Sequence, residues 1–202
     1  MANERTNLTI CNMALGYIAK ARITSLNDST ESARQCNLYY DHLRQQLLVN
    51  YNWGFAKRVT ALALLSDTTM FGYEYVYAYP TACLAIRFIY NSENAESKIY
   101  EKERYEVFTN SSGVQCIACD VENAYAEYTY DIVDADLFSV LFAEALTRCI
   151  AATIATPLCG SSAIAETQYQ LYQNALVLAK VISVQQSESK AHYPEDFISA
   201  RM

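Results

Sequence analysis

Cysteine and histidine are the side chains of this sequence best suited to bind a metal, carry out redox chemistry or act as nucleophiles. The chain has seven Cys and two His, and Cys116 and Cys119 have the C-x-x-C spacing of many zinc and redox sites. The residues around this pair predict a β-strand, in which positions three apart point to opposite faces. We therefore expect both thiols to be structural. His42 is predicted to lie exposed on a helix, and His192 falls in the C-terminal tail.

The sequence also lacks the motifs of common catalytic sites. It has no G-x-S-x-G, G-x-G-x-x-G, H-E-x-x-H or P-loop pattern. Glu144 and Arg148, four residues apart, are interpreted as an ion pair on the exposed edge of a helix. We predict no catalytic residue, no cofactor-binding residue and no metal ligand, and therefore a protein that is not an enzyme.

Protein binding is the chemistry that a run of tyrosines favours. An extended YEYVYAYP segment would place its four Tyr residues on one face. A Tyr ring buries apolar area while its hydroxyl stays hydrated, which is typical of interfaces between subunits. The predicted partner-binding residues of this segment are Tyr73, Tyr75, Tyr77 and Tyr79. The alternative is a sheet face that the protein's own helices cover.

The C-terminal tail, 187–202, is the second predicted partner-binding segment. It has no hydrophobic period, yet it contains Tyr193, Phe197 and Ile198. This pattern is typical of an extended arm that becomes ordered on a partner. We predict that these three side chains bind another protein.

The elements that position these residues are predicted from hydrophobic period. A helical period over 7–20, 29–50, 136–156 and 161–185 predicts four helices, two N-terminal and two C-terminal. Alternation over about 57–131 predicts a small antiparallel β lobe, with a hairpin at NSSG. The fold class is therefore α+β: a four-helix bundle with a central β lobe and an extended C-terminal arm. We predict a single domain over 1–186, followed by the arm at 187–202.

The helical period also predicts which face of the second and of the last helix is buried. In the second helix the buried stripe is predicted as Ala33, Cys36, Tyr40, Leu43 and Leu47, with Arg44 on the opposite, solvent face. In the last helix the stripe is predicted as Ile164, Leu171, Ala175, Leu178 and Ile182.

Trp53 and Phe55 are predicted to fix the end of the second helix, with Gly54 supplying the turn. Asp28 and Glu31 resemble a capping box before that helix, and Pro157 with Gly160 should end the third helix.

Composition narrows the class of protein. The 202 residues are 52% hydrophobic, enough for a real core, and the net charge of −7 disfavours nucleic-acid binding. An odd number of Cys within apolar runs is typical of buried thiols in a reducing compartment. The N-terminus has no signal-peptide pattern. The most apolar segment, 137–155, is interrupted by Glu144 and Arg148, so we expect no membrane span.

The order of these elements resembles the head-to-tail adaptor family of short-tailed bacteriophages, also called tail tubular protein A. Two helices precede a W-x-F-A-x-R motif, an aromatic strand ending in Pro, and the strand CLAIRFIY. The resemblance covers about 7–185. The matching residues are Trp53, Phe55, Ala56, Arg58, Tyr79-Pro80, Cys83-Leu84, Arg87, Asp134, Phe138, Phe142 to Leu146, Ala151-Ala152 and Pro157-Leu158.

The resemblance implies a structural virion protein. In that family a dodecameric ring lies between the portal protein and the tail nozzle, DNA passes through its centre, and C-terminal arms reach the portal. Tail fibres are a further partner in some relatives. It implies assembly in the host cytoplasm and a place in the virion neck. The alternatives are another neck protein, such as a stopper or tail terminator, and, least favoured, a small hydrolase.

Overall fold

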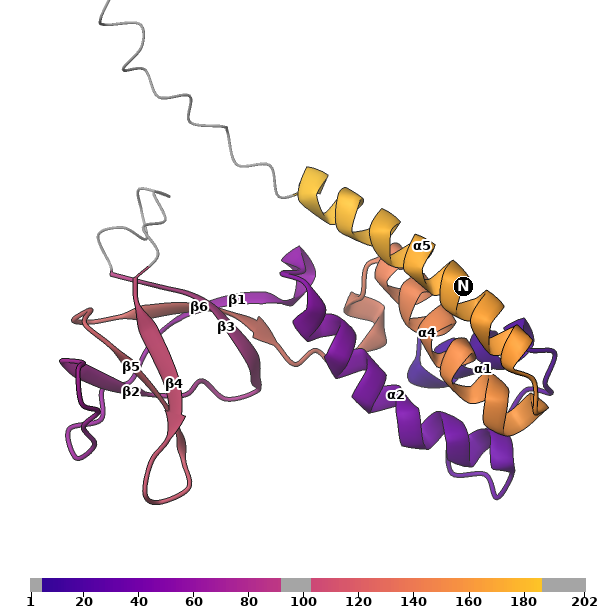
Figure 1. Ribbon diagram of the computed structural model, residues 1–202, viewed down its shortest axis with the longest axis horizontal. Helices are drawn as coiled ribbons and strands as arrows, with labels where there is room; N and C mark the ends of the chain where they lie inside the picture. The colour runs from indigo at the N-terminus through magenta and orange to yellow at the C-terminus, as the bar shows by residue number, and fades with distance from the viewer. Residues whose placement is uncertain (1–4, 92–102, 187–202) are drawn as a thin grey trace, which may run out of the picture.

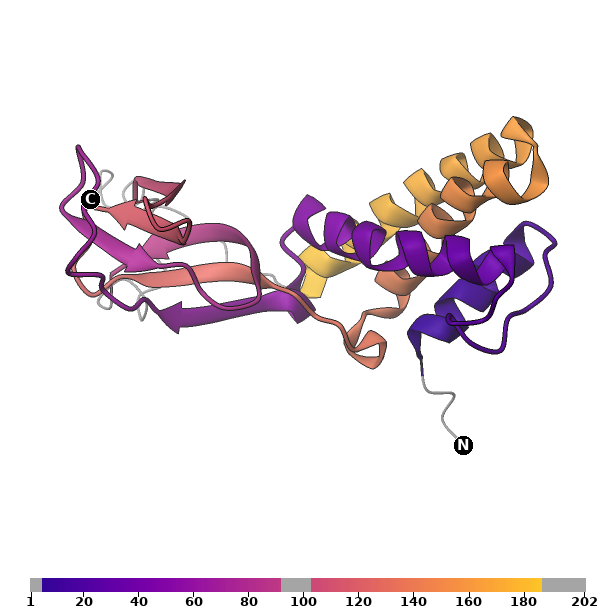
Figure 2. The ribbon, with the colours of Figure 1, turned by 90° about the horizontal axis from the view of Figure 1, so that it is seen from below.

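The computed structural model describes residues 5–91 and 103–186. The fold class is α+β, as predicted, and the described residues form four α-helices and two antiparallel sheets of three strands each. The helices gather in one lobe and the strands in another, and the two lobes lie end to end (Figures 1 and 2). Most of the charged stretch 91–104 and the whole predicted arm 187–202 lie outside the described residues.

The helical lobe is organised around one central helix. Its members are α1 (Asn7–Tyr17), α2 (Glu31–Asn50), α4 (Val140–Cys159) and α5 (Ser162–Gln186). The other three helices pack on α4, as Figure 1 shows. α4 can accept neighbours on several sides because its buried residues surround most of its circumference. α4 is therefore the central helix of this lobe.

The helix ends differ from the predicted ends for local reasons. α1 ends at Tyr17 because Ala19 adopts a left-handed φ of 56° and the Lys20 amide donates to the Leu15 carbonyl at 2.9 Å. Thr30, not Asp28, caps α2, and its hydroxyl accepts from the Ala33 amide at 3.3 Å.

The bounds of the last two helices differ too. Ser139 caps α4, so this helix begins at Val140 rather than 136. Pro157 lies inside α4, and only Gly160, with a φ of 65°, ends it. Ser161 precedes α5, and its hydroxyl accepts from the Ile164 amide at 3.4 Å.

The predicted antiparallel β lobe consists of two sheets. One sheet has the order β1-β6-β3, from Lys57–Ala61, Tyr125–Tyr130 and Cys83–Tyr90. The other has the order β2-β5-β4, from Tyr75–Ala78, Gln115–Cys119 and Tyr105–Thr109. All strand pairs are antiparallel. The NSSG hairpin joins β4 and β5 as predicted, with a φ of 79° at Gly113.

Trp53 fixes the passage from α2 into the β lobe, as predicted. Its side chain is 1% exposed, and its Nε1 donates to the Leu47 carbonyl at 2.8 Å. The ring lies edge-on to Phe142 of α4, with centroids 5.2 Å apart. Gly54 has no positive φ and begins a short 3₁₀ helix, η1 (Gly54–Ala56), so the turn does not need its conformational freedom.

Two arginines join the lobes. Arg44 of α2 is 2% exposed, contrary to its predicted solvent position, and its Nη1 donates to Asp131 at 2.5 Å and to the Ile132 carbonyl at 2.6 Å. These two acceptors lie just after β6, too far along the chain for a helical period to reveal them. Arg87 of β3 donates to the carbonyls of Val49 and Tyr51 at 2.8 and 3.0 Å, which closes the C-terminal end of α2.

Candidate partner-binding surface

The predicted tyrosine face lies partly inside the β lobe. Tyr77 is 1% exposed, and its hydroxyl donates to the Val121 carbonyl at 2.7 Å. It belongs to the apolar core between the two sheets, together with Ile89 and Ile117. Its ring therefore packs within the lobe, and we no longer assign it to partner binding. The second sheet covers this face of β2, whereas the alternative prediction was that the protein's own helices cover it.

The other three tyrosines of this run do not share one face. Tyr75 and Tyr79 are half-buried against the same core as Tyr77. Tyr73 precedes β2 and packs with Val76 on the outer side of that sheet, where Arg104 lies 4.5 Å above its ring. The chain is extended only from Tyr75, so alternation does not carry back to Tyr73. Partner binding by Tyr73, Tyr75 and Tyr79 stays a prediction.

The predicted arm residues Tyr193, Phe197 and Ile198 lie outside the described residues. Their role in binding a partner also stays a prediction. The helix that precedes them, α5, is fully described, and it carries a surface that the sequence pattern did not single out.

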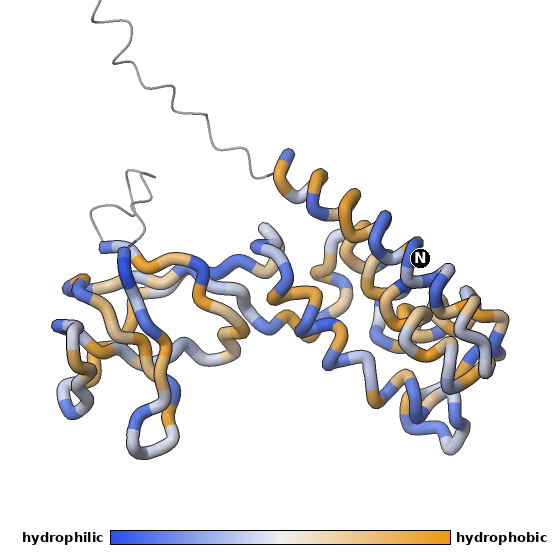
Figure 3. The backbone as a smooth tube through the Cα atoms, viewed as in Figure 1, coloured by the Kyte–Doolittle hydropathy of each residue, from blue (hydrophilic) through white to orange (hydrophobic). Residues whose placement is uncertain are grey.

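The buried face of α5 is only partly the one predicted, since Ile164 and Ala175 of the predicted stripe pack against the core. The residues that pack on α4 are Gln168, Tyr172, Leu176 and Ala179. Leu171, Leu178 and Ile182, predicted to be buried, are 40%, 58% and 39% exposed. The helix has apolar residues on several sides, so its period alone could not identify the side that faces α4. Figure 3 shows apolar segments along the whole length of α5.

Two rows of aliphatic side chains on α5 face solvent. The first, which we call the leucine stripe, consists of Leu171, Leu178 and Ile182. The second consists of Val177, Val181 and Val184, which are 59%, 48% and 50% exposed. The whole helix contains only two charged residues, Glu166 and Lys180. This composition is more typical of a helix that another surface covers than of a helix that faces water.

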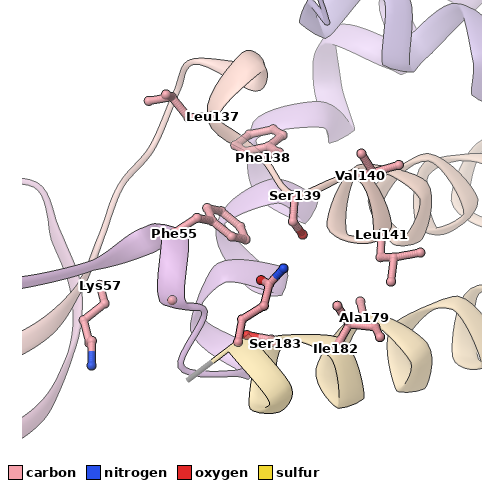
Figure 4. A pocket seen from close by; sticks show the side chains of 12 residues that line it. Phe55, Lys57, Leu137, Phe138, Ser139, Val140, Leu141, Ala179, Ile182 and Ser183 are labelled. Carbon is pink, nitrogen blue, oxygen red and sulfur yellow. The ribbon is translucent and has the colours of Figure 1, made fainter. Parts of the chain in front are cut away.

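Two hollows flank α5. One, the junction pocket, has a volume of about 630 Å³ and lies where the end of α5 meets η1 and the start of α4. In Figure 4, Ala179 and Ile182 face Leu141 and Phe55 across it. Its walls are largely apolar, and Lys57 is the charged residue among the described residues that line it.

The second hollow, the α2–α5 groove, runs between those two helices over α4 and has a volume of about 890 Å³. Its floor includes Cys149 and Ala152 of α4. Polar side chains form its rims, and the Nζ of Lys180 bridges them by donating to the Asn50 side chain at 2.7 Å. The lining residues are Leu43, Gln46, Asn50, Cys149, Ala152, Thr153, Ser162, Ala165, Glu166, Tyr169, Tyr172, Gln173, Leu176 and Lys180.

Glu144 and Arg148 belong to a half-buried polar cluster rather than to an exposed helix edge. Their side chains are 32% and 21% exposed, and their closest N–O distance is 2.8 Å. The Tyr17 hydroxyl donates to both Glu144 oxygens, and the Arg148 guanidinium lies 3.5 Å from the Tyr17 ring centroid. Burial, followed by the bond to Glu144, raises the pKa of Tyr17. The cluster joins α1, α4 and, through Gln168, α5.

The cysteines lie mostly inside the protein. Cys116 lies on the outer face of its sheet and Cys119 on the inner face, as predicted, so they point away from each other. Cys83 and Cys159 are half-buried, and the other five are buried. Burial raises the pKa of Cys149 to about 11, which keeps that thiol protonated at neutral pH. Within 5–91 and 103–186 no three Cys, His, Asp or Glu side chains gather as a metal site would require.

Comparison with known proteins does not assign the chain to a family. Neither a protein-family model nor a curated protein matches the chain. Among the described residues, α4 alone is long and apolar enough to cross a membrane by length and composition. Since more than half of that helix is buried among its neighbours, the core helix of a soluble protein explains the same pattern.

Proposed function

We propose that this chain is a structural subunit of a virion neck. In this proposal copies of the chain pack side by side into a ring, dodecameric as in the adaptor family, between the portal protein and the tail nozzle. DNA passes through the ring without sequence-specific contacts, and tail fibres are a further partner. The subunit is made in the host cytoplasm and functions as a head-to-tail adaptor.

The exposed aliphatic surface of α5 is the observation that carries this proposal. Six Val, Leu and Ile side chains of one helix are each between 39% and 59% exposed. Fully burying one such side chain is worth about 1.5–3 kcal/mol, so leaving six half-exposed is costly in a free monomer. Assembly with neighbouring proteins would recover much of that free energy.

Shape and charge support a ring in particular. The subunit is elongated, with the helical lobe at one end and the β lobe at the other (Figure 2). Long helices that lie side by side suit a closed ring of identical subunits. The net charge of −7 favours a channel that repels the phosphate backbone of passing DNA.

The finer architecture belongs to the same proposal. We infer that the four helices act as one bundle and that residues 187–202 extend from it as an arm toward the portal. The start of this segment follows directly from α5, whose last residue, Gln186, also lines the junction pocket. The arm and the exposed surface of α5 would therefore act at neighbouring places.

The test is reconstitution of the full-length protein with the portal protein of the same phage. Electron microscopy of the mixture should show a ring of this protein stacked on the portal, and native mass spectrometry should give its copy number. A protein that stays monomeric alone and ignores portal rings would overturn the proposal. A position elsewhere along the tail axis of the virion would instead indicate a stopper or terminator.

A further inference from the structure

The leucine stripe and the α2–α5 groove lie on opposite sides of α5. Residues two apart on an α-helix are separated by roughly 200° around its axis. Leu171 lies two residues from both Tyr169 and Gln173, and Leu178 lies two residues from Lys180; all three of these partners line the groove. One helix therefore presents an apolar ridge on one side and a hollow on the other.

The two surfaces are chemically compatible. The stripe is uncharged and aliphatic, with Leu178 58% exposed at its centre. The groove has apolar walls in Leu43 and Leu176, and the short side chain of Ala152 on its floor leaves room for a ridge. Its rim carries Gln46, Asn50 and Gln173 together with the charged residues Glu166 and Lys180, and a polar rim suits the edge of a contact that stays in water.

We propose that the leucine stripe of one copy packs into the α2–α5 groove of the next copy around the ring. The inference rests on the proposed ring and assigns its subunit contact. Because the ridge and the hollow lie on opposite sides of the same helix, each copy can contact one neighbour with its stripe and another with its groove. This is a head-to-tail contact, which does not stop at pairs: it builds a ring where the rotation between copies closes and an open filament where it does not.

The size of the contact argues for a ring neighbour rather than an isolated dimer. A helix of 25 residues is about 37 Å long, and a helix-to-helix contact is about 10 Å wide. The contact therefore buries at most roughly 370 Å² per partner, less than half of the about 800 Å² that stable pairs bury. Two copies joined only in this way would separate readily, whereas a closed ring makes the contact twice per copy.

Cross-linking of cysteine variants tests the pairing directly. Leu178→Cys places a thiol on the stripe and Gln46→Cys places one on the groove rim. All variants also carry Cys149→Ala, because the Cys149 thiol lines the groove and would compete for the cross-linker. The full-length protein, alone and bound to portal rings, is treated with a short bis-maleimide, and Cys149→Ala without added cysteines controls for the other native thiols. The double variant should give a ladder of dimers, trimers and larger species. Each single variant should stay at the level of that control, and a mixture of the two should give dimers.

The outcomes separate this inference from the proposed function. Dimers from Leu178→Cys alone would indicate two-fold pairing and overturn the head-to-tail contact. Rings on the portal without any cross-linked ladder would overturn this contact and leave the adaptor proposal standing. Absence of both rings and ladders would overturn both.

A charge on the stripe gives a second, independent measurement. Leu178→Asp should lower the amount of portal-bound ring by more than about tenfold at a fixed protein concentration, because the contact would bury a carboxylate. Val114→Asp is the control, since Val114 is 54% exposed and lies between β4 and β5, in the other lobe. Circular dichroism melts of both variants should match the wild type. Equal ring yields for the two variants would contradict the inference.

Discussion

Trp53 holds together three parts of the chain at one point. Its ring lies against Tyr51, Phe55 and Phe142, with centroid distances of 5.0, 6.0 and 5.2 Å. These neighbours come from the end of α2, from η1 and from α4. Because the indole N–H also has a carbonyl partner, both the apolar and the polar part of the side chain are satisfied inside the protein.

We expect Trp53→Ala to lower the free energy of unfolding by about 3–5 kcal/mol, as for other large aromatic side chains in cores. Urea denaturation followed by far-UV circular dichroism measures the loss. Phe71→Ala is the control, since Phe71 is fully exposed, and it should change stability by less than about 0.5 kcal/mol. A loss below about 1 kcal/mol for Trp53→Ala would contradict the assigned core role.

Arg44 shows what a single residue contributes when its partners lie far along the chain. Its guanidinium is almost fully buried and bonds Asp41, Asp131 and the Ile132 carbonyl. Arg44→Ala should lower the free energy of unfolding by about 3 kcal/mol, because Asp131 and a buried carbonyl lose their donor. Chemical denaturation measures the loss.

Arg34 provides the control for Arg44. Its ion pair with Glu31 has side chains 62% and 53% exposed, so Arg34→Ala should change stability by less than about 0.5 kcal/mol. If both substitutions had the same small effect, Arg44 would not stabilise the junction between the lobes.

At the scale of elements, the C-terminal end of α2 depends on a strand from the other lobe. Arg87 of β3 donates to three carbonyls at the C-terminal end of α2, those of Leu48, Val49 and Tyr51. A helix end otherwise leaves its last carbonyls without partners. Arg87 therefore both stabilises the last turn of α2 and connects it to β3 of the other lobe.

Arg87→Met should increase hydrogen exchange of the amides in 46–53 while leaving the β sheets protected. The methionine keeps the apolar stem but removes the donors, at a cost of about 2–3 kcal/mol. Hydrogen-exchange mass spectrometry makes the comparison, with Arg104→Met as the control because Arg104 is 67% exposed and bonds a loop carbonyl and Asp120 within the β lobe. Unchanged exchange over 46–53 would mean that other contacts hold the end of α2.

How far the sequence predicts an element depends on how many of its sides are apolar. The stripe of α2 follows from its period, and Ala33, Cys36, Tyr40, Leu43 and Leu47 are all buried. In α5 the apolar residues surround the helix, so the same method selected side chains that face solvent.

The sheet pairing also escaped prediction, because alternation shows which residues share a face but not which strands pair. The α2–α5 groove arises from α2 and α5 packing separately on α4, and this tertiary arrangement leaves no local signal.

At the scale of the whole molecule, we propose that the fold and the attachment to the portal reside in different parts of the chain. Apolar clusters pack the two lobes, and Arg44 and Arg87 join them. The last residue with a described element, Gln186, ends α5 at the edge of the helical lobe. Residues 187–202, which include Tyr193, Phe197 and Ile198, follow Gln186 in the sequence.

A chain truncated after Gln186 should therefore melt within a few degrees of the full-length protein, because each kcal/mol of lost stability would shift the midpoint by about 2–4 °C at this size. Binding to portal rings, measured by cosedimentation, should fall by at least about tenfold, since the arm would supply apolar contacts to the partner. Restoring only the arm with Tyr193→Ser, Phe197→Ser and Ile198→Ser should not restore attachment, whereas the wild-type arm should. Normal portal binding by the truncated chain would refute the arm assignment, and a large drop in melting temperature would place the arm within the fold.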